Sequence, residues 1–298
     1  MLIKQKHLQM NNQVLQSRDD SSVNFITTGN FVGKIEARYV RRKDWYMVVY
    51  LSSQTGCEQA CRMCHLTAMK ETRLVDVTPQ QFVEQAKTVL QWYDHHEARA
   101  DVVNFNFMAR GEALVNPYLL SDSSSILSEL QRLARERSLI PQFNISTIMP
   151  KTLAGKKLKD IFPGIQPEIY YSIYSVDEDF RKRWLPKSLP VEESLKMLVD
   201  WQEFSGKIPK IHFAFIENEN DSIESVTAIC DAINAVGLKV NVNIVRYNPF
   251  SERQGTEPSE EIIERNMHVM QELLPTARIN LIKKVGFDVQ ASCGMFAK

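Results

Sequence analysis

Three cysteines, Cys57, Cys61 and Cys64, fall close together in this sequence with the spacing C-x3-C-x2-C. They follow directly after an apolar, β-like run that ends near Ser53. Cysteine thiolates are the usual ligands of iron–sulfur clusters, and a [4Fe–4S] cluster has four irons to ligate. Three cysteines would leave one iron open to a small molecule. The spacing therefore indicates a cluster of this kind.

Two other interpretations of the cysteines are a zinc knuckle and a chance cluster. Structural zinc sites usually take four protein ligands in CxxC-type pairs. The nearest fourth candidate, His65, is adjacent to Cys64 in the chain and poorly placed to complete such a site. Ligand count and spacing favour the iron–sulfur cluster.

The composition is that of a globular chain without net charge. Its 298 residues are 44% apolar and include 36 basic and 36 acidic residues. Net charge gives no support to nucleic-acid binding, although local basic runs that converge could hold a polyanion. Four such runs are Arg41–Lys43, Lys156–Lys159, Arg181–Arg183 and Lys283–Lys284. The more ordinary role of each run is a solvated face.

The cellular compartment is indicated by the cysteines and by the lack of long apolar stretches. Five cysteines, three of them clustered, argue against a disulfide framework and for a reducing cytoplasm. Residues 1–13 contain no continuous apolar segment of the kind found in signal peptides. No stretch approaches the ~20 apolar residues that span a bilayer. We expect a soluble, cytoplasmic protein.

Apolar periodicity and turn residues predict strands that alternate with helices. Thr78 is a predicted N-cap, with Pro79 at the first helical position and Gln81 completing a capping box. The predicted strands after the cysteines are 102–108, 143–147, 168–172, 210–215, 239–245 and 278–283. The further predicted helices are 117–137, 151–161, one opened by Pro190, 222–236 and 259–274.

This alternation predicts an α/β fold. Strand–helix–strand units are right-handed and build a parallel sheet, and we expect six of them to curl into an incomplete (β/α)6, TIM-like barrel. Chemistry in such barrels lies at the C-terminal ends of the strands. Residues 29–298 are predicted to form one domain, with an N-terminal β-hairpin over 31–53 and a C-terminal tail over 285–298. Residues 1–28 are predicted to be a flexible lead-in.

Several short segments resemble the RlmN/Cfr family of radical S-adenosylmethionine (radical-SAM) RNA methyltransferases. The similarity runs from about Gly29 to Lys298. The segments are SSQTGC at 52–57, GEALVN at 111–116, IST at 145–147, SIY at 172–174, NPF at 248–250 and ASCG at 291–294. Each is weak alone, but their shared order and spacing make the set specific. The resemblance is to a divergent, short member of the family.

The resemblance implies a partial (β/α)6 radical-SAM barrel with a [4Fe–4S] cluster on Cys57, Cys61 and Cys64, and SAM on the open iron. The implied SAM contacts are Gly111, Glu112, Ser146, Ser172, Ile173, Tyr174 and Asn248. The backbone and carboxylate at Gly111–Glu112 could accept from the SAM α-ammonium group. Asn248 is an implied ribose or adenine contact.

A reaction is implied as well. In radical-SAM chemistry the reduced cluster passes one electron to SAM, which releases methionine and a 5′-deoxyadenosyl radical. In the family, the cysteine that corresponds to Cys293 carries a methyl group whose carbon is added to an adenine ring carbon, C2 or C8, of rRNA or tRNA. The implied partners are structured RNA and an electron donor such as flavodoxin or ferredoxin. We expect a monomer.

The chain departs from the family pattern at several places. Tyr50 stands where the family has a second cysteine that resolves the protein–RNA adduct, and Ala113 and Tyr174 replace a proline and a histidine. The remaining cysteine, Cys230, falls on an apolar helical stripe and is predicted to be core. The family also carries an RNA-binding helical domain before the hairpin, where only about thirty residues stand here.

Three hypotheses follow from these features. The first is methylation of an RNA adenine through Cys293. The second keeps the cluster and SAM but places a different nucleotide, RNA or peptide in the site, because Tyr50 replaces the resolving cysteine. The third is a non-catalytic RNA- or ribosome-binding protein, which the three cysteines make the least attractive.

Overall fold

One ten-stranded sheet organises residues 11–298, the part of the chain that this computed structural model describes. The strands lie in sequence order, antiparallel from β1 to β4 and parallel from β4 to β10. They are β1 (Asn11–Gln16), β2 (Val23–Thr28), β3 (Ile35–Lys43), β4 (Tyr46–Tyr50), β5 (Val102–Phe107), β6 (Ile140–Thr147), β7 (Glu168–Tyr171), β8 (Lys210–Phe213), β9 (Asn241–Val245) and β10 (Ile279–Ile282). Since β1 and β10 are the two edges of this sheet, the barrel is incomplete.

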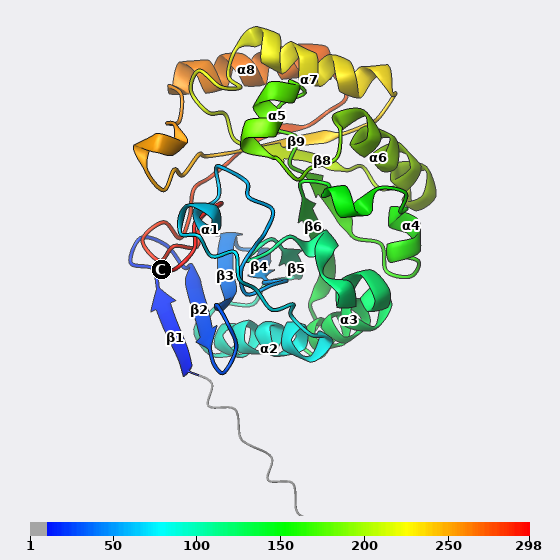
Figure 1. The fold of residues 1–298 in the computed structure, drawn as a ribbon. Coiled ribbons are helices and arrows are strands. Elements are labelled where there is room, and N and C mark those ends of the chain that lie inside the picture. Colours follow the sequence, from blue (N-terminus) through cyan, green and yellow to red (C-terminus); the bar gives the residue numbers. More distant parts are fainter. Residues whose placement is uncertain (1–10) are drawn as a thin grey trace, which may run out of the picture.

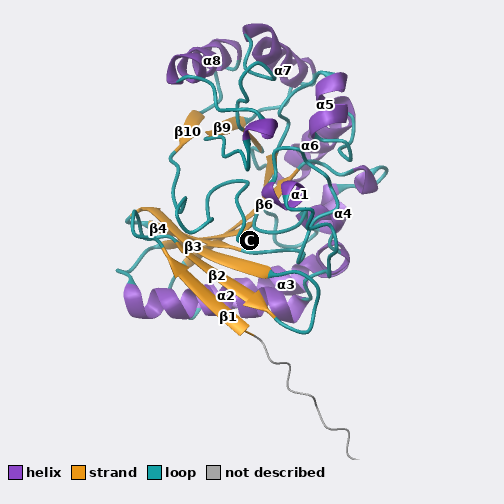
Figure 2. Ribbon diagram, turned by 60° about the vertical axis from the view of Figure 1, so that its left-hand side comes forward, coloured by secondary structure: helices purple, strands orange, loops and turns teal. Residues whose placement is uncertain are grey.

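Helices connect the parallel strands, and all but the short first one, next to the cysteine loop, lie around the outside of the curved sheet (Figures 1 and 2). They are α1 (His65–Ala68), α2 (Pro79–His96), α3 (Pro117–Arg135), α4 (Leu158–Ile161), α5 (Glu178–Trp184), α6 (Val191–Ser205), α7 (Ile223–Ala235) and α8 (Glu260–Leu273). Three short 3-10 segments, Ala113–Val115, Lys151–Leu153 and Glu252–Gln254, lie in the connections. The architecture is the predicted α/β one, a partial barrel with an antiparallel extension at its N-terminal side.

Side-chain alternation along the strands separates an apolar outer face from a more polar inner one. In β5, Val103, Phe105 and Phe107 belong to the main apolar core. Asn104 and Asn106 alternate with them, so their side chains point to the opposite face of the sheet. The Nδ2 of Asn144 on β6 donates to the Oδ1 of Asn106 at 2.7 Å. Packing therefore lies mainly between sheet and helices, and polar groups face the inside of the curve.

The predicted helix start and hairpin are present. The Thr78 hydroxyl accepts from the Gln81 N–H and the Gln81 side chain accepts from the Thr78 N–H, which is the expected capping box at the start of α2. The hairpin is β3 and β4, with a register irregularity between Val40 and Lys43. Within residues 11–298, no helix has the length and apolarity needed to cross a membrane.

The prediction of a flexible lead-in over residues 1–28 is wrong for residues 11–28, and residues 1–10 lie outside the described part. Strands β1 and β2 pair with each other and then with β3. β1 is polar and exposed, so its composition does not suggest a strand. Backbone pairing holds it in place, while Val23 and Phe25 of β2 are buried in the main core.

Two predictions between β6 and β8 also differ from the structure. The continuous basic helix over 151–161 is instead one 3-10 turn and the short α4, separated by Gly155 at φ +73°. The acidic segment after β7, for which the sequence predicts no helix, contains α5. Asp177 caps this helix, its side chain accepting from the Phe180 N–H at 2.6 Å.

Candidate cluster and cofactor site

The cysteine loop runs from the end of β4 to α1 and is shaped by close backbone contacts. The Cys57 N–H donates to the Glu71 carbonyl at 3.0 Å, and the Cys64 N–H donates to the Cys61 carbonyl at 3.1 Å. A Cβ added at Gly56 would lie 2.6 Å from the same Glu71 carbonyl oxygen. Only glycine permits this approach, so Gly56 is part of what shapes the loop.

The three cysteine side chains share surroundings that disfavour their ionisation. All three residues are half-buried. Burial raises the pKa of Cys57 to about 12, and the neighbouring Cys64 adds to the increase. Burial also raises the pKa of Cys61 and Cys64, and for Cys64 nearby Arg110 and Arg38 act in the opposite direction. A bound, positively charged metal centre would lower these pKa values and stabilise the thiolate form.

The three thiols do not form a site for a single metal ion in this structure. Within residues 11–298, no three His, Cys, Asp or Glu side chains converge on a point that could hold a single metal ion. The ligands of a [4Fe–4S] cluster bind different irons, so their sulfur atoms surround a larger body. The assignment of these three thiols to a cluster therefore rests on their residue type and on their spacing in the sequence.

Gly111 and Glu112 lie against the chain that enters the cysteine loop. Gly111 has φ +93°, and a Cβ there would lie 2.7 Å from the Ser53 Oγ, so glycine is required. The Glu112 carboxylate accepts from the N–H groups of Leu114 and Ile148, both at 3.1 Å. Burial raises the pKa of Glu112 to about 7. The carboxylate braces the ends of β5 and β6 and retains lone pairs for a cationic donor.

The predicted SAM contacts at the ends of β6 and β7 differ in burial and in the polar groups that they carry. Ser146 and Ser172 are half-buried at the C-terminal ends of these strands. Ile173 is fully buried in the apolar core, so its side chain contributes packing. Tyr174 has φ +55°, an uncommon backbone conformation for a bulky residue and one that is frequent at functional sites. Burial raises the pKa of Tyr174, and Cys293 adds to the increase.

Asn248 supplies a buried hydrogen-bonding atom that has no partner. Its Nδ2 donates to the Cys293 carbonyl at 3.0 Å, and its own carbonyl lies 3.0 Å from the His65 Nε2. Its Oδ1 is buried and unpaired. A buried acceptor of this kind is costly unless a donor reaches it. An adenine amino group or a ribose hydroxyl is such a donor, so the site fits SAM at this point.

Cys293 lies on the C-terminal tail next to the cysteine loop. The N–H of His65, the residue after Cys64, donates to the Gly294 carbonyl at 3.1 Å. The Cys293 residue is exposed, yet surrounding protein raises the pKa of its thiol to about 11.

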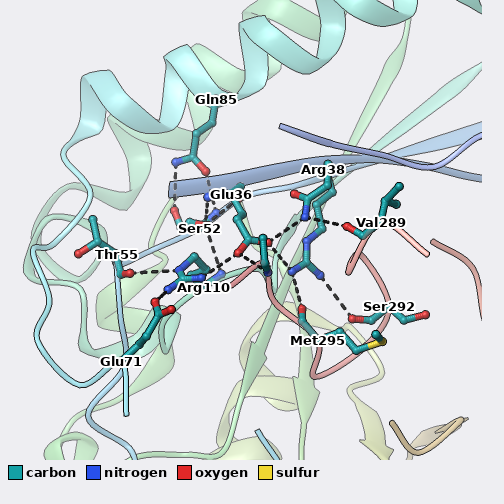
Figure 3. A network of polar contacts seen from close by, with 12 residues as sticks. Glu36, Arg38, Ser52, Thr55, Glu71, Gln85, Arg110, Val289, Ser292 and Met295 are labelled. Carbon is teal, nitrogen blue, oxygen red and sulfur yellow. Dashed lines mark hydrogen bonds and ion pairs between the residues drawn. The ribbon is translucent and has the colours of Figure 1, made fainter. Parts of the chain in front are cut away.

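A network of charged residues around Glu36, Arg38 and Arg110 was not predicted (Figure 3). The Glu36 carboxylate binds Arg110 at 2.8 Å and Arg38 at 2.9 Å, and all three side chains are buried. Figure 3 shows these side chains pointing toward one another between the hairpin and the tail. Side chains alternate along a strand, so the predicted hairpin places Glu36 and Arg38 together on one face and Ile35 and Ala37 on the other. This alternation is the sequence signal that could have indicated the Glu36–Arg38 pair. Their partner Arg110 is 74 positions from Glu36, so no local sequence pattern predicts that contact.

Tyr50 and Cys230 lie outside this network and pack in apolar surroundings. Tyr50 packs against Val40, Val48 and Val285 in a small apolar cluster. Cys230 is fully buried on α7, as its place on the apolar stripe predicts, and burial raises its pKa to about 11.

Known proteins similar to this chain include two named dual-specificity RNA methyltransferase RlmN. The protein from Sulfurovum sp. is 27% identical over 86% of this chain, and the one from Nitratiruptor sp. is 27% identical over 87%. The chain spans about two thirds of the length of such relatives, 65–67%. No family model matches the chain. The crystal structure of a radical SAM methyltransferase from Sphaerobacter thermophilus superposes with a TM-score of 0.78 at 19% identity, covering 96% of this chain and 80% of that one.

The open barrel of this chain therefore has the same fold as that radical SAM methyltransferase structure. Its sequence is similar, over most of the chain, to proteins named dual-specificity RNA methyltransferase RlmN, and this similarity supports the resemblance to the RlmN/Cfr family.

Proposed function

We propose that this chain is a radical-SAM methyltransferase that methylates an adenine ring carbon, C2 or C8, of rRNA or tRNA, with Cys293 as the methyl carrier. The observation that carries the proposal is the position of Cys293 beside the cysteine loop. The Gly294 carbonyl accepts from His65, and the Cys293 carbonyl accepts from Asn248. The names of the relatives support RNA as the substrate class.

Cys57, Cys61 and Cys64 would hold a [4Fe–4S] cluster with SAM on its open iron. When bound, this pair supplies a radical that removes hydrogen from otherwise unreactive carbon. Glu112 would orient the SAM ammonium group, because its carboxylate is already fixed by two N–H donors. Asn248 would accept from the adenosine part of SAM through its unpaired Oδ1. Gly111, Ser146, Ser172, Ile173 and Tyr174 would line the same site.

The proposed partners follow from the same chemistry. Structured RNA would be the substrate, and a low-potential protein such as flavodoxin or ferredoxin would supply electrons. A monomer working in the cytoplasm would suffice, since the residues proposed for the cluster and for SAM come from one chain.

The test is anaerobic reconstitution of the full chain with iron, sulfide and SAM, followed by mass analysis of the peptide containing Cys293. We expect one added methyl group on this peptide and none on the peptide containing Cys230. The Cys293→Ser variant should bind the cluster normally and form 5′-deoxyadenosine without methylating RNA. An unmodified Cys293 peptide under turnover conditions would overturn the carrier role.

A second candidate function is favoured by Tyr50, which packs among valines where a resolving thiol is expected. In this alternative, the cluster and SAM act on a different nucleotide, RNA or peptide. The Tyr50→Cys variant discriminates the two candidates. Gain of RNA methylation, or release of a trapped protein–RNA adduct, would support the first candidate. The absence of both effects would support the second candidate.

A further inference from the structure

The backbone around Cys293 is held from several distant parts of the chain. Four consecutive carbonyls accept hydrogen bonds across the fold. They are Ser292 (from Arg38, 3.4 Å), Cys293 (from Asn248, 3.0 Å), Gly294 (from the His65 N–H, 3.1 Å) and Met295 (from Arg38, 2.6 Å). With the backbone fixed in this way, rotation of the side chain remains as the main freedom of the thiol.

Arg38 makes two of these contacts, one on each side of Cys293. It lies on β3 and its side chain is 3% exposed. Its Nη1 donates to Ser292 and its Nη2 donates both to Met295 and to the Glu36 carboxylate. The guanidinium also lies 4.9 Å from the centre of the Phe296 ring. Most of its contacts are therefore directed at the tail.

Glu36 joins Arg38 to the entrance of the cysteine loop. One carboxylate oxygen accepts from Arg38, and the other accepts from Arg110 at 2.8 Å and from the Ala297 N–H at 3.1 Å. The Arg110 Nε donates in turn to the Thr55 carbonyl at 3.1 Å, just before Cys57. One buried carboxylate thus connects the chain that carries the cluster ligands with the chain that carries Cys293 (Figure 3).

Stability alone is a poor explanation for this arrangement. Buried ion pairs can often be replaced by apolar side chains of similar size without loss of stability, because desolvation offsets their attraction. Their directed hydrogen bonds, in contrast, fix geometry in a way that apolar contacts do not. The contacts of Arg38 on both sides of Cys293 fit that second role.

We propose that Arg38, oriented by Glu36, is a positioning residue that holds Cys293 in register with the cysteine loop. The catalytic consequence rests on the proposed function of Cys293, whereas the structural one does not. Loss of Arg38 should loosen the tail and misplace the thiol, while Arg110 still balances the charge of Glu36 and holds Thr55.

The experiment compares Arg38→Met, Arg38→Lys and the control Arg137→Met in the full chain. Arg137 is half-buried and binds Asp94 and the Leu133 carbonyl, away from the tail. Hydrogen exchange measured by mass spectrometry should be about tenfold or more faster over residues 292–297 in Arg38→Met, because hydrogen bonds to a charged group are lost. Arg38→Lys should show partial protection, and Arg137→Met should match the unaltered chain.

The reconstituted proteins provide a second readout. Arg38→Met should bind as much iron as the unaltered chain and form 5′-deoxyadenosine at a similar rate. Methylation of Cys293 should fall about tenfold or more, since small misplacements of reacting groups have effects of this size. A merely structural role would lower both products together, and Arg38→Lys should recover part of the methylation.

Unchanged exchange over residues 292–297 in Arg38→Met would overturn the proposal, as would a parallel loss of both products. Should Arg38→Met fail to fold, Ala297→Pro removes the N–H that binds Glu36 without altering the buried charges, and it should loosen the tail in the same direction. If Cys293 is never methylated in the unaltered chain, the proposed function fails, and hydrogen exchange still decides the role of Arg38.

Discussion

At the scale of single residues, the site combines buried thiol, amide and carboxyl groups that a bound cofactor would ligate or hydrogen-bond. The thiols of Cys57, Cys61 and Cys64 have raised pKa values, mainly through burial. Asn248 keeps a buried acceptor without a partner, and Glu112 holds a carboxylate away from water. A bound cluster would hold the thiols as thiolates, and donors on SAM would pair with Asn248 and Glu112, so we expect cofactor binding to stabilise the fold.

Replacing one predicted cluster ligand should abolish cluster binding. In Cys61→Ala, two thiols remain, and we expect iron and sulfide per chain to fall to near background after anaerobic reconstitution. Cys230→Ala is the matched control, because Cys230 is a buried cysteine on α7 and should leave the iron content unchanged. Equal iron in both variants would contradict the assignment of the ligands.

Glu112 should make the apoprotein less stable as the pH rises. Folding raises the pKa of Glu112 from 4.5 to about 7, so the native state keeps a proton that the unfolded chain releases. The resulting stability is complete below about pH 4.5 and is lost by about pH 7, a change of about 3 kcal/mol.

Urea unfolding of the apoprotein at several pH values measures this change. In Glu112→Gln the fall in the free energy of unfolding across this range should be smaller by that amount. Glu129→Gln, at an exposed ion pair on α3, should behave like the unaltered chain. An identical pH profile in Glu112→Gln would rule out this residue as the source.

At the scale of elements, the C-terminal tail is held by the N-terminal strands as well as by Arg38. Asp288 accepts from the Ser17 hydroxyl at 2.7 Å and from the Arg18 N–H at 2.9 Å, and Asp20 accepts from the Gly286 N–H at 2.8 Å. The turn between β1 and β2 is thereby joined to the start of the tail. Through these hydrogen bonds, β1 and β2 help to hold the tail that carries Cys293.

Asp288→Ala should therefore loosen the first part of the tail. Two hydrogen bonds to a carboxylate are lost at a partly exposed position, so we expect a destabilisation of about 1 kcal/mol. Hydrogen exchange should accelerate over residues 285–291 and stay unchanged in β9. Asp19→Ala, in the same turn, is the control and should have no effect. Faster exchange in both variants would point to a general loosening of the turn.

At the scale of the whole molecule, the exposed basic runs differ in whether acidic neighbours pair with them. Lys156, Lys157 and Lys159 lie between β6 and β7 and are exposed, and within residues 11–298 they form no ion pair. Lys182 and Lys196 are instead paired with acidic neighbours on their own helices. The basic run over 156–159 is thus the better candidate for contact with RNA phosphates.

Replacing Lys156, Lys157 and Lys159 together with alanine should weaken RNA binding. We expect an affinity loss of about tenfold or more at low salt and a salt dependence reduced by about two to three charges. Filter binding to rRNA and tRNA fragments across a salt series measures both quantities. The double variant Lys182→Ala, Lys196→Ala should bind as the unaltered chain does. Equal losses in the two variants would indicate a diffuse charge effect.

The sequence by itself determined what depends on neighbours along the chain. The grouped thiols lie within one loop, the capping box of Thr78 and Gln81 spans one helical turn, and strand alternation predicts the sheet. The α/β class and the main helices could therefore be predicted. The polar β1 could not, because its pairing comes from the backbone rather than from an apolar pattern.

Only the tertiary structure decided which distant residues meet around Cys293. Arg38 and the Met295 carbonyl are 257 positions apart, and Arg110 reaches Glu36 across 74. No local periodicity encodes such pairs, since they form only when the curved sheet brings the hairpin, the end of β5 and the tail together. The physical reason is that a buried charge needs a partner close in space, and the path of the whole chain determines which residue lies there.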